Sequence, residues 1–307
     1  MNFTAKVKNE IITEKLSPCC KLAALSAYLR TAGTVEIQGG FVGFSIVGET
    51  EVNGYFQKII NDLYGIKPTL LPEKQGERTK AVYVSEKTAN VLVDTEILRI
   101  QRGGLDIVLG ISDKLIKKPC CKRAYIKGAF LGSGSVTIPK MKSDKATGYH
   151  MEFVFSKYLS ASDFCNILSD NGLIAKLIER KDAFVVYTKS SEEICDLLVT
   201  VGAKRACLEL QDVIVKKMVK NNTNRIVNCE ISNLNKQVDA SLKSRTDIQT
   251  IESVLGLNNL PASLKTVAEA RLSFPDDSLS QLAERLELTK SCLSHRLKRL
   301  SEIAESL

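Results

Sequence analysis

The sequence predicts an α+β protein in which a duplicated αββαββα unit is followed by an all-α segment. The segment Pro18-Cys19-Cys20-Lys21 returns as Pro119-Cys120-Cys121-Lys122, and the residues after it keep the same register. The matched pairs are Ala23 and Ala124, Gly33 and Gly134, Val35 and Val136, and Ile37 and Ile138. Two such copies commonly form one pseudo-symmetric domain, with equivalent helices packed at an internal two-fold axis.

The first copy begins with a helix at 18–32, because Pro18 suits a first helical turn, apolar residues recur at helical spacing, and Gly33 ends the pattern. Apolar alternation and turn residues predict the elements that follow. They are strands at 34–38 and 41–47, a helix at 52–64, strands at 66–71 and 81–84, and a helix at 86–100.

The second copy predicts the same order of elements. They are a helix at 119–132, strands at 135–139 and 149–155, a helix at 161–170, strands at 173–179 and 184–188, and a helix at 192–201. We therefore expect halves at 1–110 and 111–220, and a helical domain at 221–307 with a helix-turn-helix at about 275–307.

The C-terminal segment is helical throughout in its periodicity. One helical pattern runs from 203 to about 242 and crosses Asn221-Asn222-Thr223-Asn224, where we expect the interdomain break. Further helices are predicted at 247–255, 264–272, 278–286 and 289–307. Ser278 and Gln281 have the spacing of a capping box, and Thr289 suits the cap of the last helix. The last two helices and their short connection predict the helix-turn-helix.

The last helix carries a candidate DNA-reading face. Leu293, Leu297 and Leu300 lie on one side, which predicts that the opposite side faces solvent. Hydroxyl, imidazole and cationic groups without an acid suit a major groove. The predicted DNA-binding residues are Lys290, Ser291, Ser294, His295, Arg296, Lys298 and Arg299. The alternative is an ordinary amphipathic helix with a basic solvated face.

A net charge of +8 favours a polyanionic partner. A second basic segment, 114–127, holds six cations, the first at Lys114, and no acid. Together with the polar loop at 140–147 it supplies candidate contacts to the DNA backbone. These are Lys117, Lys118, Lys122, Arg123, Lys127, Lys140, Lys142 and Lys145. Solvated helix faces and an ordinary hairpin are the alternatives.

The histidine and cysteine content argues against several kinds of site. His150 and His295 are the only histidines, which leaves few candidates for a triad or a zinc finger. Nine cysteines, no signal peptide and no long apolar run indicate a reduced cytoplasm, with no membrane partner. Adjacent cysteines on a helix point about 100° apart. With no other cysteine or histidine at ligand spacing, we expect the paired thiols to serve packing, and no metal or cofactor.

The stretches 25–33 and 126–134 resemble the signature helices of the LAGLIDADG homing endonucleases. The resemblance implies that both helices pack at the pseudo-two-fold axis and that the sheets form a saddle over DNA. Ala27, Gly128 and Ala129 are small enough to let two helix backbones approach closely.

In that family an acidic residue before the terminal glycine of each helix binds the divalent ions used in cleavage. Ala32 and Ser133 stand at these positions, and neither supplies an anionic oxygen. Glu36 follows the first helix, but Thr137 occupies its place in the second copy. We therefore expect no catalytic residues.

The whole chain resembles the bacterial WhiA family. The residues that carry the resemblance are 122–125, 128–131, 134–136, 224–228, 282–286, Lys290, Ser291 and 295–297. The resemblance implies a DNA-binding protein of transcriptional control, linked to sporulation, cell division and chromosome segregation. The C-terminal domain also looks like region 4 of bacterial sigma factors.

We expect a non-enzymatic, sequence-specific DNA-binding protein. Its expected partner is double-stranded DNA, with other transcription or division proteins as further candidates, and its expected location is cytoplasmic and nucleoid-associated. Two alternatives remain: an active or residual LAGLIDADG-type endonuclease, and a partner-docking scaffold on the nucleoid.

Overall fold

The computed structural model describes residues 2–38, 41–72, 78–101, 104–139 and 148–307. The chain divides into two compact units, Met1–Lys217 and Met218–Leu307. The first unit contains two copies of an αββαββα arrangement, and the described part of the second unit is helical. The predicted α+β fold class, with its duplication and its helical C-terminal part, is confirmed.

The first copy forms one antiparallel sheet of order β1-β2-β4-β3. Its elements are α2 (Pro18–Ala32), β1 (Gly33–Gln38), β2 (Phe41–Glu49), α3 (Thr50–Tyr64), β3 (Thr69–Pro72), β4 (Arg78–Tyr83) and α4 (Thr88–Asp94). Tyr28 of α2 stacks on Phe56 of α3 with ring centroids 3.9 Å apart, which ties the two helices together.

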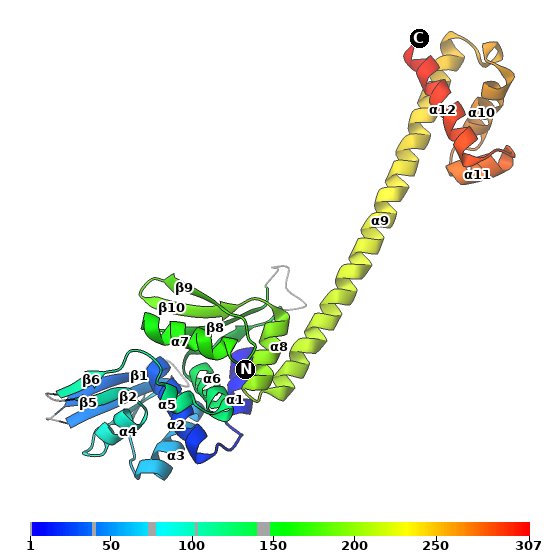
Figure 1. Cartoon of the computed structure of the whole chain (residues 1–307). Helices are drawn as coiled ribbons and strands as arrows, with labels where there is room; N and C mark the ends of the chain where they lie inside the picture. The colour runs from blue at the N-terminus through cyan, green and yellow to red at the C-terminus, as the bar shows by residue number, and fades with distance from the viewer. Residues whose placement is uncertain (1, 39–40, 73–77, 102–103, 140–147) are drawn as a thin grey trace. The chain divides into compact units, whose positions relative to one another are not determined.

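The second copy forms an antiparallel sheet of order β7-β8-β10-β9. Its elements are α6 (Pro119–Ser133), β7 (Ser135–Thr137), β8 (His150–Phe155), α7 (Tyr158–Ser169), β9 (Lys176–Arg180), β10 (Ala183–Thr188) and α8 (Ser191–Thr200). The two copies therefore share one topology, and Figure 1 shows both sheets packed around the central helices.

The helices α2 and α6 pack closely along the internal two-fold axis. A Cβ atom on Gly128 would lie 2.1 Å from the carbonyl oxygen of Ala24, and one on Gly132 would lie 1.9 Å from the Thr31 hydroxyl. No larger residue fits at Gly128 unless the backbones separate. The prediction that small residues bring these helices together is confirmed.

The first unit also has elements outside the repeat: α1 (Phe3–Ile11), β5 (Leu98–Gln101), β6 (Gly104–Ile107) and α5 (Asp113–Ile116). The predicted helix at 86–100 was too long, because α4 ends at Asp94 and β5 begins at Leu98. Glu96 takes a left-handed φ of 51°, and the Ile97 amide donates back to the Leu92 carbonyl at 2.8 Å. This hydrogen bond and the left-handed residue before it end the helix in the way that a glycine usually does.

The helix α9 (Lys204–Val254) continues without interruption through residues 221–224. The boundary between the two compact units falls after Lys217, close to the predicted interdomain break, although the helix itself is not interrupted there. The helix predicted at 247–255 is the end of α9. The Thr223 hydroxyl donates to the Val219 carbonyl at 3.0 Å, a bond that helices accommodate.

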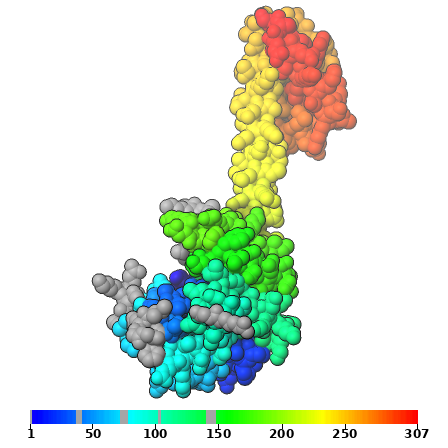
Figure 2. Space-filling model, turned by 60° about the vertical axis from the view of Figure 1, so that its left-hand side comes forward, coloured from blue at the N-terminus to red at the C-terminus, as the bar shows by residue number. Residues whose placement is uncertain are grey.

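The second unit buries one small core around the end of α9. The elements after α9 are η1 (Leu257–Asn259), α10 (Ala262–Ser273), α11 (Leu279–Arg285) and α12 (Lys290–Glu305). Ile248, Val267, Leu282 and Leu293 are fully buried in this core. Figures 1 and 2 show the last residues packed against the C-terminal part of α9, where Lys243 pairs with Glu305 at 3.3 Å.

Candidate nucleic-acid interface

Side-chain caps define the helix-turn-helix of the second unit. The Ser278 hydroxyl accepts from the Gln281 amide at 3.4 Å, and the Ser278 amide donates to the Gln281 side chain at 2.9 Å. The Thr289 hydroxyl accepts from the Cys292 amide at 3.2 Å. Both predicted caps are confirmed, and Glu287, with a left-handed φ of 52°, turns the chain between the helices.

The orientation of α12 follows from its apolar side. Leu293 and Leu300 are buried, and Leu297 packs against the same core. Ser291 and His295 consequently face solvent on the other side, as the periodicity predicted. Lys290, Ser294 and Lys298 are exposed as well. This surface offers donors to a groove without any carboxylate between 290 and 299.

Two of the predicted DNA-binding arginines already have partners within the unit. Arg296 is half-buried and donates to the Ser263 carbonyl at 3.4 Å. Arg299 pairs with Glu302 at 2.9 Å, and the hydrogen bond from Arg299 lowers the pKa of that carboxyl. Arg299 can exchange this exposed partner for a phosphate. Arg296 would first have to break its hydrogen bond to the Ser263 carbonyl of α10.

A buried arginine fixes the start of α11. The Arg271 guanidinium donates to the Asp277 carbonyl at 2.7 Å and lies 3.5 Å from the Ser241 hydroxyl. Burial lowers the pKa of Arg271, and the nearby Asp277 opposes this effect. Arg285 lies over the Phe274 ring, 4.1 Å from its centroid. These contacts hold α11 against α9 and α10, and α12 packs on α11.

A basic cavity of about 550 Å³ lies beside α12. Lys236 and Lys243 of α9 line it together with Ser294 and Lys298 of α12. Neither of these two α9 lysines was predicted from the sequence as a site residue. Their spacing of two helical turns placed them on one side of α9, but only the tertiary packing brings that side to α12.

Three of the six cations in the basic segment 114–127 of the first unit are paired with carboxylates. Lys114 pairs with Glu96 at 3.3 Å, and Lys122 pairs with Asp170 at 2.5 Å. Lys127 is 5% exposed and its ammonium pairs with Glu14. The prediction that Lys127 contacts the DNA backbone was wrong, because its place on α6 faces the interior of the unit.

The other predicted backbone contacts fall into two groups. Lys117, Lys118 and Arg123 are exposed and remain available to a phosphate. Lys140, Lys142 and Lys145 lie outside the described residues.

The C-terminal ends of α2 and α6 carry no carboxylate at the positions where the endonucleases hold metal. Ala32 has no polar side-chain atom, and the Ser133 hydroxyl accepts from the Val154 amide at 3.0 Å. Glu36 lies nearby on β1, where hydrogen bonds from Ser45 and then Lys80 lower its pKa. The Glu36 carboxylate already has partners within the sheet, because the Lys80 ammonium lies 3.1 Å from its Oε1 atom.

The N-terminal ends of the same helices bring four thiols together. Among the residues that the structure describes, one group of His, Cys, Asp or Glu could hold a metal: Cys19, Cys20, Cys120 and Cys121, whose Sγ atoms all lie within 4.8 Å of one another. The expectation that these cysteines have no partner at ligand spacing was wrong. Each cysteine pair lacks such a partner in its own part of the sequence, but packing about the two-fold axis brings the two pairs together.

The thiols of this cluster differ in environment. The hydrogen bond from Ser17 is the main cause that lowers the pKa of Cys19 to about 7. Burial raises the pKa of Cys20 and raises that of Cys121 to about 12.

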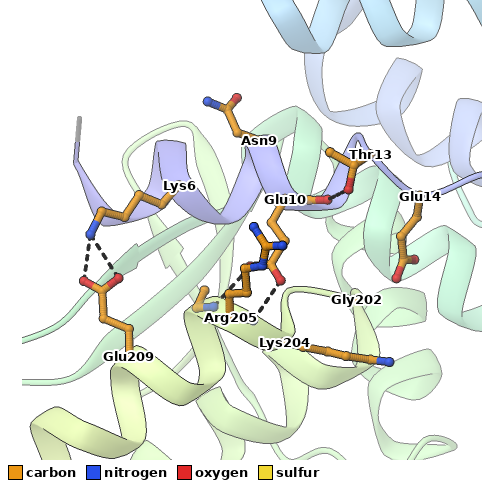
Figure 3. Close-up of a pocket in the computed structure, with 10 residues that line it drawn as sticks. Lys6, Asn9, Glu10, Thr13, Glu14, Gly202, Lys204, Arg205 and Glu209 are labelled. Atoms are coloured by element: carbon orange, nitrogen blue, oxygen red, sulfur yellow. Dashed lines mark hydrogen bonds and ion pairs between the residues drawn. The ribbon is translucent and has the colours of Figure 1, made fainter.

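A cavity of about 840 Å³ in the first unit lies between α1 and the start of α9. Figure 3 shows Lys6 pointing to Glu209, and the two lie 2.8 Å apart. The Glu10 carboxylate accepts from the backbone amides of Arg205 at 2.7 Å and Ala206 at 3.1 Å. These groups cap α9 and hold it to α1, so the cavity has a structural explanation.

Comparisons with known proteins agree with this architecture. Residues 223–304 match the family model of the WhiA C-terminal HTH domain, and residues 122–220 match that of the WhiA LAGLIDADG-like domain. The probable cell division protein WhiA of Alkaliphilus oremlandii is 36% identical, and the match covers 100% of this chain and 98% of that protein. Its counterpart of the same name in Clostridium beijerinckii is 35% identical, with 100% and 99% covered.

Two solved structures share the fold. The crystal structure of full-length DUF199/WhiA from Thermatoga maritima has a TM-score of 0.61 and 22% identity, covering 100% of this chain and 99% of that chain. The N-terminal LAGLIDADG domain of DUF199/WhiA has a TM-score of 0.52 and 16% identity, covering 69% and 96%. No described helix is long and apolar enough to cross a membrane.

Proposed function

Because the chain belongs to the WhiA family, we propose that it is a non-enzymatic, sequence-specific DNA-binding protein whose helix α12 reads bases. The observation that carries this proposal is the outward face of α12. Ser291 and His295 are exposed there, opposite the buried Leu293 and Leu300. An exposed helix face with hydrogen-bonding groups and cations matches the major groove in size and chemistry.

We further propose a division of labour between the two units. Lys290 and Lys298 border the base-reading residues on α12 and suit phosphate contacts. Lys117, Lys118 and Arg123 of the first unit are exposed and would add contacts to the DNA backbone or to a protein partner. The fold of the first unit would then serve binding without cleavage.

The names of the relatives suggest the biological setting. Both relatives compared above are named probable cell division protein WhiA. We propose that the protein regulates transcription of genes linked to cell division, chromosome segregation or sporulation, and that it associates with the nucleoid. Genome-wide crosslinking of the tagged protein tests this proposal, and a random distribution over the chromosome would contradict it.

A selection experiment tests base reading directly. The full-length protein is used to select from a random duplex pool, in parallel with a Ser291→Ala/His295→Ala variant. We expect a defined motif from the parent protein and none from the variant. Lys265→Ala, a cation on α10 paired with Glu269, is the matched control and should select the parental motif. A motif that survives in this double variant would place base reading elsewhere.

The LAGLIDADG-like fold makes an endonuclease the second candidate. Because Ala32 and Ser133 supply no anionic ligand, we expect the protein to leave bound DNA intact with Mg²⁺ or Mn²⁺. The measurement is a cleavage assay on the selected duplex. Metal-dependent cleavage that persists in Lys298→Ala, which weakens binding by α12, would support the enzyme.

Loss of all DNA affinity on removal of residues 236–307 would instead favour a docking scaffold.

A further inference from the structure

Four cysteines meet where the N-terminal ends of α2 and α6 come together. Cys19 and Cys20 belong to the first copy of the repeat, and Cys120 and Cys121 to the second. Their Sγ atoms all lie within 4.8 Å of one another, and those of Cys120 and Cys121 are 4.0 Å apart. The internal two-fold axis thus turns two adjacent pairs into one four-thiol cluster.

The spacing of the four sulfurs suits a single ion. Zinc binds thiolate sulfur at about 2.3 Å, so a tetrahedral site has sulfurs about 3.8 Å apart. Shifts of well under an ångström per side chain would bring the cluster from its present spacing to that geometry. An iron–sulfur cubane attaches each of its four cysteines to a different iron and therefore needs a wider spacing.

Two thiols of the cluster are buried and two are partly exposed to solvent. Cys20 is 6% exposed and Cys121 is 4% exposed, so one thiol of each pair is fixed inside the packed helices. Cys19 and Cys120 are half-buried at the rim. An ion can reach the two outer thiols from solvent and then complete its coordination with the two inner ones.

The surroundings favour bound thiolates. Both helices begin at the cluster, with Pro18 and Pro119 in their first turns, so the positive ends of two helix dipoles converge on it. Lys117, Lys118 and Arg123 lie next to it in the chain and are exposed. Four thiolates around a divalent cation would carry excess negative charge, which the two helix ends and nearby cations of this kind would help to offset.

We propose that Cys19, Cys20, Cys120 and Cys121 bind one Zn²⁺ ion, which links the two halves of the first unit at the N-terminal ends of α2 and α6. Soft thiolates select zinc over hard ions such as Mg²⁺ or Ca²⁺, and a closed set of four protein ligands is typical of a structural zinc site. On binding, four S–Zn bonds form and the thiol protons pass to solvent. No electron is transferred, and the site is separate from Ala32 and Ser133 at the other end of each helix.

The first test measures the metal content of the full-length protein, purified with a thiol reductant and without chelators. We expect about one zinc per chain by mass spectrometry of the metal. Replacement of zinc by Co²⁺ should give the intense absorption of tetrahedral cobalt thiolate. Zinc-free preparations that take up neither ion would overturn the proposal, and so would one iron per chain with zinc absent.

Variants assign the ion to the cluster. Cys19→Ser/Cys120→Ser removes the two rim ligands and should reduce bound zinc to near zero, while the buried Cys20 and Cys121 keep their packing. Cys165→Ser is the control, because Cys165 is also half-buried and lies outside the cluster. It should retain the full zinc content. Full retention of zinc by the double variant, or equal loss in the control, would overturn the assignment.

A third measurement separates the metal site from a disulfide pair in the same cluster. Counting reactive thiols under denaturing conditions with a chelator, but without a reductant, should give nine free thiols per chain, equal to the nine cysteines of the sequence. A deficit of two that disappears in Cys19→Ser/Cys120→Ser would indicate a disulfide and contradict zinc binding. Circular dichroism of each variant before assay confirms that it is folded.

Discussion

The two basic segments of this chain look alike in sequence and differ in the structure. Both 114–127 and 290–299 contain several cations and no acid. In the first segment, Lys114, Lys122 and Lys127 each pair with a carboxylate from another part of the unit. In the second, only Arg299 among the described residues forms an ion pair, and its partner is a near neighbour on the same helix.

The difference shows that an acid-free run in sequence is not an acid-free surface. The partners of the first segment are Glu14, Glu96 and Asp170, which lie far from it in the chain. The segment covers α5 and the first half of α6, and other parts of the unit pack against both helices, so folding brings carboxylates to them. The α12 helix packs on one side only and leaves the other to solvent.

The largest expected effect is the loss of stability when buried Lys127 loses its carboxylate partner. Glu14→Gln should lower the free energy of unfolding of the first unit by about 3 kcal/mol, because it leaves a buried ammonium without its anion. This is the lower end of the usual cost, since Glu14 is 43% exposed and water can approach. All eight tyrosines lie in the first unit and the chain has no tryptophan, so tyrosine fluorescence during urea unfolding reports on that unit alone.

The matched control is Glu209→Gln. The Lys6–Glu209 pair is exposed at both partners, and removing it should change the free energy of unfolding by about 0–1 kcal/mol. Equal effects of the two variants would contradict the burial of Lys127. Loss of DNA affinity in folded Glu14→Gln would mean that this region contacts DNA after all.

Much of the fold was predictable because its signals are local or repeated. The repeated Pro-Cys-Cys-Lys segment marked equivalent helices, and the Ser278 and Thr289 caps fixed where α11 and α12 begin. The end of α4 was missed because Glu96 adopts a left-handed conformation without being glycine. The full length of α9 was missed because its pattern was taken to end near 242 and a separate helix was expected at 247–255, whereas one helix runs on to Val254.

The candidate site was predictable only where one helix determines it. The outward face of α12 follows from the positions of Leu293 and Leu300. Lys236 and Lys243 were missed because their relevance depends on how α9 packs against α12. The four-thiol cluster was missed for a similar reason, although the repeat and the expected two-fold axis together already implied that the two cysteine pairs meet.

The next prediction concerns base reading by α12. His295→Ala or Ser291→Ala should reduce the preference for the selected site over scrambled DNA by about 1–3 kcal/mol per lost base contact. Affinity for scrambled DNA should change little, because neither side chain is a fixed cation. Ser253→Ala, an exposed hydroxyl near the end of α9, is the control and should keep full specificity. Unchanged specificity in both α12 variants would remove them from the reading face.

Lys298 and Lys290 should behave differently from His295. If each neutralises one phosphate, alanine at either position weakens binding to every sequence and reduces the slope of log affinity against log salt by about 1. The measurement is binding to selected and scrambled duplexes across a salt series. Lys298 also lines the cavity with Lys236 and Lys243, so Lys236→Ala should show the same loss of slope if the DNA backbone enters there. A change in sequence preference for Lys298→Ala would instead make it a base contact.

The smallest effect is expected from the exposed part of the first basic segment. Lys117→Ala/Lys118→Ala should lower affinity for scrambled and selected DNA alike, with a change in salt slope below about 1 per lysine, because these side chains would meet only backbone charge. The same salt series measures this, and the zinc content of the variant shows whether the neighbouring thiol cluster is intact. If these two changes abolish specificity in a folded, zinc-loaded protein while His295→Ala and Ser291→Ala retain it, base reading belongs to the duplicated unit. The two basic segments would then have exchanged the roles that their exposure assigns to them.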